Sequence, residues 1–177
     1  AVPLEEKREI IRFAAEQIKG RVKFFAGTGS MIPGETAELS RFALEAGADG
    51  VVVISPYYFT LTQDSIYDFY ADLAEKVSGD IYIYNFPDRT GYNISAETMG
   101  RLAEKYPNIV GCKDTMSGMD HTREIIKRIK PVRPDFKVYS GFDDNFGYNV
   151  MSGGDGCIGG LSNVLPGFFK EWMDAFE

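Results

Sequence analysis

Apolar side chains recur with a helical period in some segments of the chain and form short unbroken runs in others. In residues 3–19 they return every three or four positions, which predicts a helix with one buried face. Its apolar positions are Ile10, Ile11, Ala14, Ala15 and Ile18. Further helices are expected over residues 35–46, 63–76, 96–105, 120–129 and 166–176, with another between 141 and 155. Strand-like apolar runs cover residues 22–26, 50–55, 81–85, 109–113, 136–140 and 156–160.

The predicted elements alternate: one helix is followed by six strand–helix units. Strict alternation predicts a parallel sheet with helices outside it, closed as a barrel or open and doubly wound. The dinucleotide turn of the open type is only partly matched by Gly27-Thr28-Gly29. Six strands are too few for an ordinary eight-stranded barrel. If the fold is a barrel, we expect two more units before Ala1.

Composition narrows the function classes. The 177 residues are 44% hydrophobic and 14% aromatic, enough for a globular core. A net charge of −7 argues against nucleic acid or an anionic membrane as partner. No apolar stretch approaches the roughly 20 residues of a membrane span. Cys112 and Cys157 are too few for a disulfide framework, so a cytoplasmic location is expected.

Lys113 ends a predicted strand, where the active sites of parallel α/β proteins form. Strand alternation places it on one face with Ile109 and Gly111. Above an apolar barrel interior an ammonium loses hydration, which favours the neutral amine that attacks carbonyl groups. The competing interpretation is a lysine that reaches water or pairs with Asp114.

Two further side chains follow the neighbouring strand. Tyr84 shares a face with Tyr82 and, at the strand's end, is placed to pass protons to a group on Lys113. A pair of core tyrosines is the alternative. Arg89 lies in the turn NFPDRTG, where a guanidinium suits a substrate carboxylate. The alternative is a surface arginine paired with Asp88 or another acid.

Several weaker signals remain open. The aromatic run at Tyr57 and Tyr58 suggests a subunit contact or a site wall. Asp143 and Asp144 are suited to acid–base work or to holding hydroxyl groups, and they lack a third ligand at metal-binding spacing. The glycines near residue 159 suit either a phosphate cradle or a tight strand entry. His121, at a helix start, is expected in solvent.

Taken together, YNFPDRTG, GCKDT, SGFDD and GGDGCIGGLSN, with AGTGS and ISPYY upstream, resemble the dihydrodipicolinate synthase and N-acetylneuraminate lyase family. These are pyruvate-dependent class I aldolases and lyases on (β/α)₈ TIM barrels, usually tetramers. The resemblance covers essentially the whole chain as strands three to eight. It implies that residues 1–177 form one partial TIM-barrel catalytic domain, which needs no metal or organic cofactor.

The resemblance also implies roles for the motif residues. Lys113 matches the Schiff-base lysine and Tyr84 the proton-relay tyrosine. Tyr58 is similar to a second relay tyrosine that family members supply across a dimer interface, and Tyr57 to its interface neighbour. Ile158 matches the residue whose backbone faces bound pyruvate. The implied partners are small molecules, namely pyruvate with an aldehyde or sugar acid, and further copies of the chain in a homodimer or homotetramer.

Specificity signals are mixed. Arg89 resembles the arginine by which dihydrodipicolinate synthases bind the carboxylate of their second substrate. Thr115, Asp143 and Asp144 are more similar to sugar-acid aldolases, in which such residues hold substrate hydroxyls. The GxxGE loop of strand two, which binds the pyruvate carboxylate in the family, is not in the sequence, so this chain alone is expected to bind pyruvate poorly. The alternatives are a non-catalytic fragment or paralogue with a binding or assembly role, and a phosphate-binding isomerase barrel.

Overall fold

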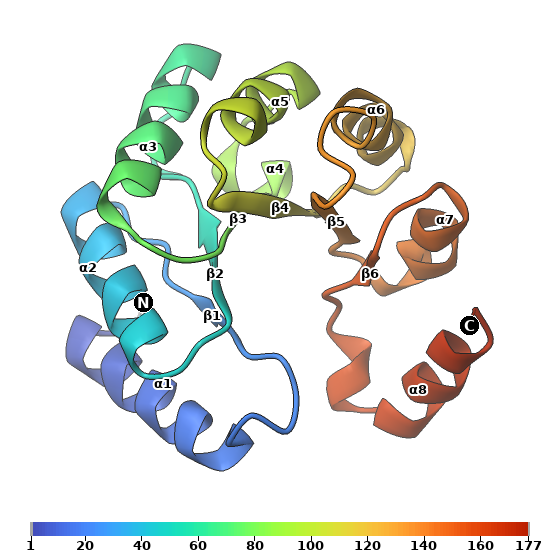
Figure 1. Ribbon diagram of the computed structural model, residues 1–177, viewed down its shortest axis with the longest axis horizontal. Coiled ribbons are helices and arrows are strands. Elements are labelled where there is room, and N and C mark those ends of the chain that lie inside the picture. Colours follow the sequence, from blue (N-terminus) through green and yellow to red (C-terminus); the bar gives the residue numbers. More distant parts are fainter. Residues whose placement is uncertain (1, 177) are drawn as a thin grey trace.

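A curved sheet of six parallel strands forms the inner layer of the computed structural model, which describes residues 2–176. The strands lie side by side in chain order (Figure 1). A doubly wound sheet reverses its strand order at a switch point, and this sheet does not, so the open dinucleotide-binding alternative is wrong. The strands are β1 Phe25–Gly27, β2 Gly50–Ile54, β3 Ile81–Asn85, β4 Ile109–Asp114, β5 Lys137–Ser140 and β6 Gly156–Cys157.

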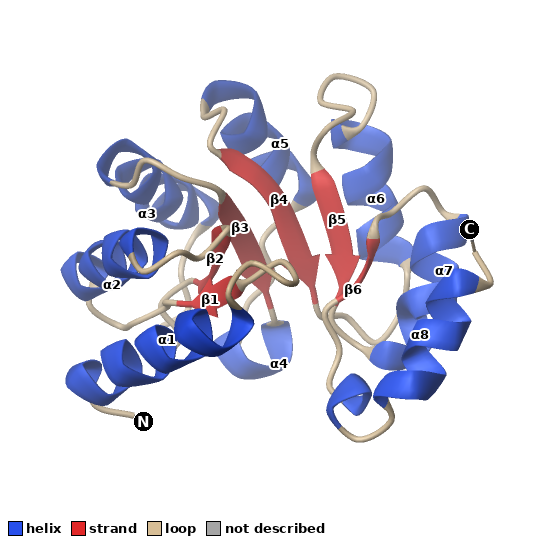
Figure 2. Cartoon of the chain, turned by 60° about the horizontal axis from the view of Figure 1, so that its bottom comes forward, coloured by secondary structure: helices blue, strands red, loops and turns tan. Residues whose placement is uncertain are grey.

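The helices line the outside of the sheet (Figures 1 and 2). The alternation of strand and helix expected from the sequence is confirmed, with α4 as an additional single turn between β3 and α5. The helices are α1 Leu4–Ile18, α2 Pro33–Glu45, α3 Gln63–Lys76, α4 Pro87–Thr90, α5 Ala96–Lys105, α6 Asp120–Ile129, α7 Phe146–Met151 and α8 Pro166–Asp174. Two short 3₁₀ turns, Asp143–Asn145 and Leu161–Asn163, follow β5 and β6.

Local chemistry explains why α3 and α5 begin where the periodicity predicts. The Thr62 hydroxyl accepts a hydrogen bond from the Ser65 amide, and the Ser95 hydroxyl accepts one from the Thr98 amide. Such N-caps satisfy amide groups that have no partner within the helix and stabilise it by about 1 kcal/mol.

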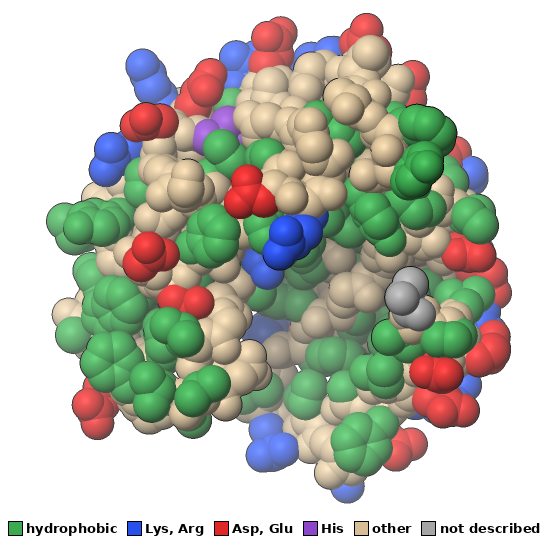
Figure 3. Space-filling view, turned by 180° about the vertical axis from the view of Figure 1, so that it is seen from behind, with side chains coloured by type: hydrophobic (Ala, Val, Ile, Leu, Met, Phe, Trp, Pro, Cys, Tyr) green, Lys and Arg blue, Asp and Glu red, His purple; other side chains and the backbone are tan. Residues whose placement is uncertain are grey.

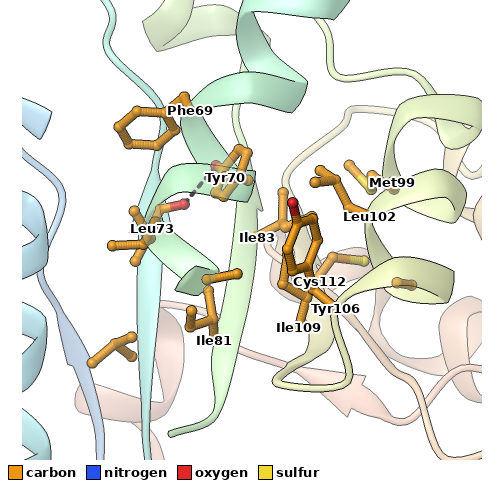
Figure 4. Packing of buried hydrophobic residues seen from close by; sticks show 14 of the residues in the cluster. Phe69, Tyr70, Leu73, Ile81, Ile83, Met99, Leu102, Tyr106, Ile109 and Cys112 are labelled. Carbon is orange, nitrogen blue, oxygen red and sulfur yellow. Dashed lines mark hydrogen bonds between the residues drawn. The ribbon is translucent and has the colours of Figure 1, made fainter. Parts of the chain in front are cut away.

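The hydrophobic core lies between the outer face of the sheet and the helices. Ile83 of β3 and Cys112 of β4 are fully buried and pair in register on this face. They pack against Tyr70 of α3 and Leu102 of α5 (Figure 4). The Tyr70 hydroxyl donates to the Val53 carbonyl at 2.8 Å, so the core contains no unpaired phenol at this position.

Aromatic rings fill the part of the inner face that lies further from the carboxyl ends of the strands. The Tyr82 ring centroid lies 4.8 Å from that of Phe25 and 6.1 Å from that of Tyr139. Gly111 makes room for this ring, because a Cβ at that position would stand 2.7 Å from Tyr82 and 2.6 Å from the Lys137 carbonyl. Tyr82 is thus a core side chain of the inner face, and Tyr84, two residues on, stands closer to the carboxyl ends of the strands.

Three details of the predicted pattern were wrong. Ile10 is 58% exposed, and Ile11 is the only buried residue of α1. The first strand begins at Phe25 instead of residue 22, because the Phe24 amide binds the Asp49 carboxylate. The last strand stops at Cys157 instead of residue 160, because the Gly160 and Leu161 amides bind the Asp143 carboxylate. No helix within residues 2–176 is long and apolar enough to cross a bilayer.

Candidate active site

Lys113 and Tyr84 lie next to each other at the carboxyl ends of β4 and β3. Their Cα atoms are partners in the parallel ladder, and the Lys113 amine stands 4.4 Å from the centroid of the Tyr84 ring. Both side chains are half-buried. Among the described residues, no carboxylate lies within ion-pair distance of this amine. The amine is therefore placed beside a phenol and is not neutralised by an acid.

Asp114 is not the partner of Lys113, so that alternative is wrong. Its side chain lies on the opposite face of β4, where it is 1% exposed. The Asp114 carboxylate accepts hydrogen bonds from Asn85, Thr122 and His121. Strand alternation is the physical reason, because consecutive side chains point to opposite faces.

Phe86 joins Arg89 to the lysine–tyrosine pair. The Phe86 ring is stacked at 20° on the Tyr84 ring with centroids 5.9 Å apart, and the Arg89 guanidinium lies 5.4 Å from the Phe86 centroid. Phe142, which follows β5, meets Phe86 edge-on. Both cations thus lie against one aromatic stack. Within residues 2–176 Arg89 makes no ion pair, so its expected alternative pairing with Asp88 is wrong.

Asp143 has a structural role that the sequence did not reveal. Its carboxylate accepts hydrogen bonds from the Gly160 amide at 3.0 Å and the Leu161 amide at 3.1 Å. A Cβ on Gly159 would come within 2.0 Å of the same carboxylate. The glycine-rich segment therefore surrounds the Asp143 carboxylate of the same chain. Because the Gly160 and Leu161 amides already bind this carboxylate, they are not available to bind a phosphate. Asp144, in contrast, is exposed.

The other predicted site residues differ in their surroundings. The Thr115 hydroxyl is buried against Gly141 and has no hydrogen-bond partner among the described residues. The Ile158 amide donates to the Ser140 carbonyl at 2.9 Å, which fixes the backbone after β6. Tyr57 and Tyr58 are 45% and 79% exposed, and the Tyr58 ring packs edge-on against Phe59. The roles expected for these four residues remain predictions.

The expectation for His121 was wrong. It begins α6 as predicted but is only 9% exposed. Its Nδ1 lies 3.0 Å from Asp114 Oδ1, and its Nε2 lies 3.0 Å from the Ile94 carbonyl oxygen. Burial alone lowers the pKa of this imidazole, but hydrogen bonding and the charge of Asp114 outweigh burial and raise it above 6.5. Sequence reasoning missed this residue because its partners are 7 and 27 positions away.

The face seen from behind Figure 1 is hollowed near its middle, with Lys or Arg side chains at the edge of the hollow (Figure 3). A separate cavity of about 610 Å³ lies between β6, α7 and α8 and does not include Lys113 in its lining. In the described part of the chain, no three His, Cys, Asp or Glu side chains are grouped so as to hold a metal ion.

The sequence model of the Dihydrodipicolinate synthetase family matches residues 2–177. The chain belongs to this family. It is 46% identical over 174 residues to a 4-hydroxy-tetrahydrodipicolinate synthase of Kosmotoga olearia, covering 98% of the chain and 59% of the relative. It is 37% identical over 174 residues to the putative 2-dehydro-3-deoxy-D-gluconate aldolase YagE of Escherichia coli, covering 96% of the chain and 58% of the relative. The chain therefore spans about three fifths of these curated relatives.

Solved structures agree with the family assignment. YagE from Escherichia coli, crystallised with pyruvate, superposes with a TM-score of 0.92 at 36% identity, covering 99% of this chain and 60% of that one. Dihydrodipicolinate synthase from Aquifex aeolicus gives a TM-score of 0.92 at 38% identity, covering 99% and 59%. These neighbours are TIM barrels, and the six parallel strands described above form part of such a barrel.

Proposed function

We propose that this chain carries the reacting lysine of a carbon–carbon lyase that acts on pyruvate or a related 2-oxo acid through a Schiff base on Lys113. The observation that carries the proposal is the Lys113 amine, 4.4 Å from the Tyr84 ring centroid at the carboxyl end of the sheet and without a carboxylate partner among the described residues. The pyruvate bound to YagE and the aldolase and synthase names of the relatives support the same chemistry.

The proposed reaction proceeds in steps that give each side chain a task. The deprotonated Lys113 amine attacks C2 of the 2-oxo acid, and one proton passes from the nitrogen to the carbonyl oxygen to give a neutral carbinolamine. The carbinolamine hydroxyl then takes up a second proton and leaves C2 as water, which gives the protonated imine, and loss of a proton from C3 gives the enamine. The enamine carbon adds to an aldehyde in synthesis, and the same steps in reverse release the aldehyde. The Tyr84 hydroxyl moves the protons during imine formation and cleavage.

The proposed active site also includes a side chain from a second copy of the chain. Tyr58 is 79% exposed, as expected for a side chain that reaches a neighbouring copy of the chain. Its ring packs edge-on against Phe59, with centroids 4.8 Å apart. We assign Tyr58 to proton relay in a partner's site and Tyr57 to the interface, which makes the working form a homodimer or homotetramer.

The side chains near the lysine–tyrosine pair bear on the identity of the second substrate. Arg89, held on Phe86 and free of acids within residues 2–176, favours a substrate with a carboxylate. Asp143 is occupied by two backbone amides, which weakens its assignment to sugar hydroxyls. Thr115 and Asp144 remain available for that role. The strands correspond in this proposal to three to eight of the barrel, consistent with a chain about three fifths as long as its relatives.

Borohydride trapping tests the Schiff base. Incubation of the full-length protein with pyruvate and sodium borohydride should add one reduced adduct, and peptide mass spectrometry should place it on Lys113. Lys113→Arg, which keeps the charge, should abolish the adduct, whereas Lys127→Arg on the exposed side of α6 should leave it unchanged. A folded full-length protein that gives no adduct at saturating pyruvate, or an adduct spread over surface lysines, contradicts the proposal and favours a binding or assembly role.

A further inference from the structure

A buried hydrogen bond joins the residues that directly follow Tyr84 and Lys113. Asn85 and Asp114 are Cα partners in the β3–β4 ladder, as Tyr84 and Lys113 are one position earlier. On the outer face of the sheet, Asn85 Nδ2 donates to Asp114 Oδ1 at 2.8 Å. In each strand, one side chain (Tyr84 or Lys113) therefore lies on the inner face, and the next (Asn85 or Asp114) forms this hydrogen bond on the outer face.

Asn85 has all of its polar atoms engaged. Its Nδ2 also donates to Asn93 Oδ1 at 2.8 Å, and its Oδ1 accepts from the Ile94 amide at 3.0 Å. The side chain is 1% exposed. Since a buried amide that loses a partner is costly, the rotamer of Asn85 is held by three bonds at once.

The Asp114 carboxylate is held just as firmly. Thr122 Oγ1 donates to Oδ2 at 2.6 Å, and His121 Nδ1 lies 3.0 Å from Oδ1 and 3.1 Å from Oδ2. Both nitrogens of His121 face acceptors, because Nε2 lies 3.0 Å from the Ile94 carbonyl oxygen. Only an imidazolium donates from both nitrogens. A buried carboxylate is thus paired with a buried cation, as burial requires.

Backbone pairing alone leaves this strand pair irregular. The β3–β4 register shifts between Ile81 and Tyr82, so the ladder is interrupted before it reaches the site. Beyond the shift, the Thr115 amide donates to the Asn85 carbonyl at 2.9 Å, and the side-chain bond between Asn85 and Asp114 adds a second link at the same level. Asn85 and Asp114 are one position beyond the lysine–tyrosine pair along the two strands, on the opposite face of the sheet.

We propose that Asn85 and Asp114 are positioning residues, whose bond on the outer face of the sheet sets the approach of the Lys113 amine to Tyr84 on the inner face, with His121 and Thr122 holding the Asp114 carboxylate for that bond. The inference rests on the proposed Schiff-base function and deepens it. Displacing a reacting group by about 1 Å costs on the order of a hundredfold in rate. The hydrogen bond between Asn85 and Asp114, called the brace below, therefore affects the reaction rate if it fixes the position of the Lys113 amine.

The test compares borohydride trapping in Asn85→Ala, Asp114→Asn and Asn108→Ala. Asn108 is a matched control: its Nδ2 also donates two bonds, both of 2.9 Å, to the Ala74 and Val77 carbonyls at the opposite end of the sheet. We expect a similar drop in the urea midpoint for the three variants. Only the first two should trap pyruvate on Lys113 more slowly, by about tenfold to a hundredfold. The pyruvate concentration for half-maximal trapping should stay within twofold.

Two further measurements make the test decisive. If the brace acts through the lysine–tyrosine pair, Tyr84→Phe combined with Asn85→Ala should be no slower than Tyr84→Phe alone, whereas independent effects multiply. Thr122→Val, nearly equal in shape, replaces any variant that does not fold and should slow trapping severalfold. Wild-type trapping rates in Asn85→Ala or Thr122→Val overturn this inference alone. Failure of the full-length wild-type protein to be trapped overturns the proposed function, and this inference with it.

Discussion

The Lys113 amine stands 4.4 Å from the centroid of the Tyr84 ring, and the two residues are ladder partners on adjacent parallel strands. This relationship separates two contributions of the tyrosine. The electron-rich ring attracts a cation, and the hydroxyl transfers protons. Phenylalanine keeps the first contribution and removes the second.

Tyr84→Phe should therefore slow the trapping of pyruvate on Lys113 by about a hundredfold while leaving the fold intact, because general acid–base catalysis contributes that order of rate. Tyr82→Phe is the matched control, since Tyr82 lies on the same face of β3 and packs against Phe25 and Tyr139. It should trap at a rate within twofold of wild type. Equal rates for Tyr84→Phe and wild type would remove the tyrosine from the mechanism.

Arg89→Ala should weaken recognition of a second substrate that bears a carboxylate. Loss of a charge-assisted bidentate pair costs about 1.5–3 kcal/mol, so KM for succinic semialdehyde should rise at least tenfold, with KM for butanal within twofold. Arg101→Ala serves as control, because Arg101 is likewise stacked on an aromatic ring, that of Tyr67, at 4.5 Å. Unchanged discrimination between the two aldehydes in Arg89→Ala would favour a sugar-acid substrate held elsewhere.

Asp155→Asn should destabilise the fold by about 2–3 kcal/mol, because it leaves two lysines unpaired at a mostly buried position. The Asp155 carboxylate lies 2.7 Å from Lys130 Nζ and 3.0 Å from Lys137 Nζ, and it accepts from the Val138 amide at 2.9 Å. It thereby ties α6 and β5 to the entry of β6. Asp72→Asn, at an exposed pair with Lys76, should cost about 0.5 kcal/mol or less.

The Asp155 contribution has a defined pH dependence. Burial favours the neutral acid, but the bonds from Lys130, the Val138 amide and Lys137 outweigh it and lower the pKa below 3.8. The stabilisation is therefore complete above the unfolded-state pKa and is lost as the pH falls through the folded-state value. Urea unfolding at pH 7 and pH 3 should show wild type and Asp155→Asn converging in acid. A constant difference would contradict the ion-pair account.

His121 should behave in the opposite sense. Its raised pKa means that its stabilisation is complete below 6.5 and is lost as the pH rises through the folded-state value. The charged groups that act on it are Asp114 of β4 and Glu124 of α6. The free-energy difference between wild type and His121→Gln should be about 2–3 kcal/mol at pH 6 and shrink towards pH 9. Because the chain has one histidine, its NMR titration is unambiguous, and a pKa below 6.5 would contradict the imidazolium.

Periodicity predicted the elements whose ends are set by neighbouring residues. The bounds of α3, α5 and α6 are those expected, and for α3 and α5 the capping residues Thr62 and Ser95 are visible in the sequence. The ends of β1 and β6 were misplaced, because amides there bind Asp49 and Asp143 from other parts of the chain. Such contacts leave no periodic signal.

The candidate site shows the same division. Alternation along β4 predicted the face that Lys113 shares with Ile109 and Gly111 but left pairing with Asp114 open, and the ladder of the folded sheet brings Tyr84 beside the lysine. The role of Phe86 in joining Arg89 to Tyr84 was not predictable, since it depends on ring orientation. Nor was the burial of His121, because a polar residue at a helix start is ordinarily hydrated and only its distant partners Asp114 and Ile94 make burial favourable.

The two-residue repeat of a strand gives β3 and β4 a division of labour. At one level the pair Tyr84 and Lys113 lies half-buried on the inner face, and at the next level Asn85 and Asp114 are buried on the outer face. In the functions proposed above, the inner pair performs the chemistry and the outer pair keeps the two strands aligned for it. To transplant this amine into another protein, a designer would need to transfer all four residues, two from each strand, and not the inner pair alone. The receiving strands would have to be parallel neighbours with the same register.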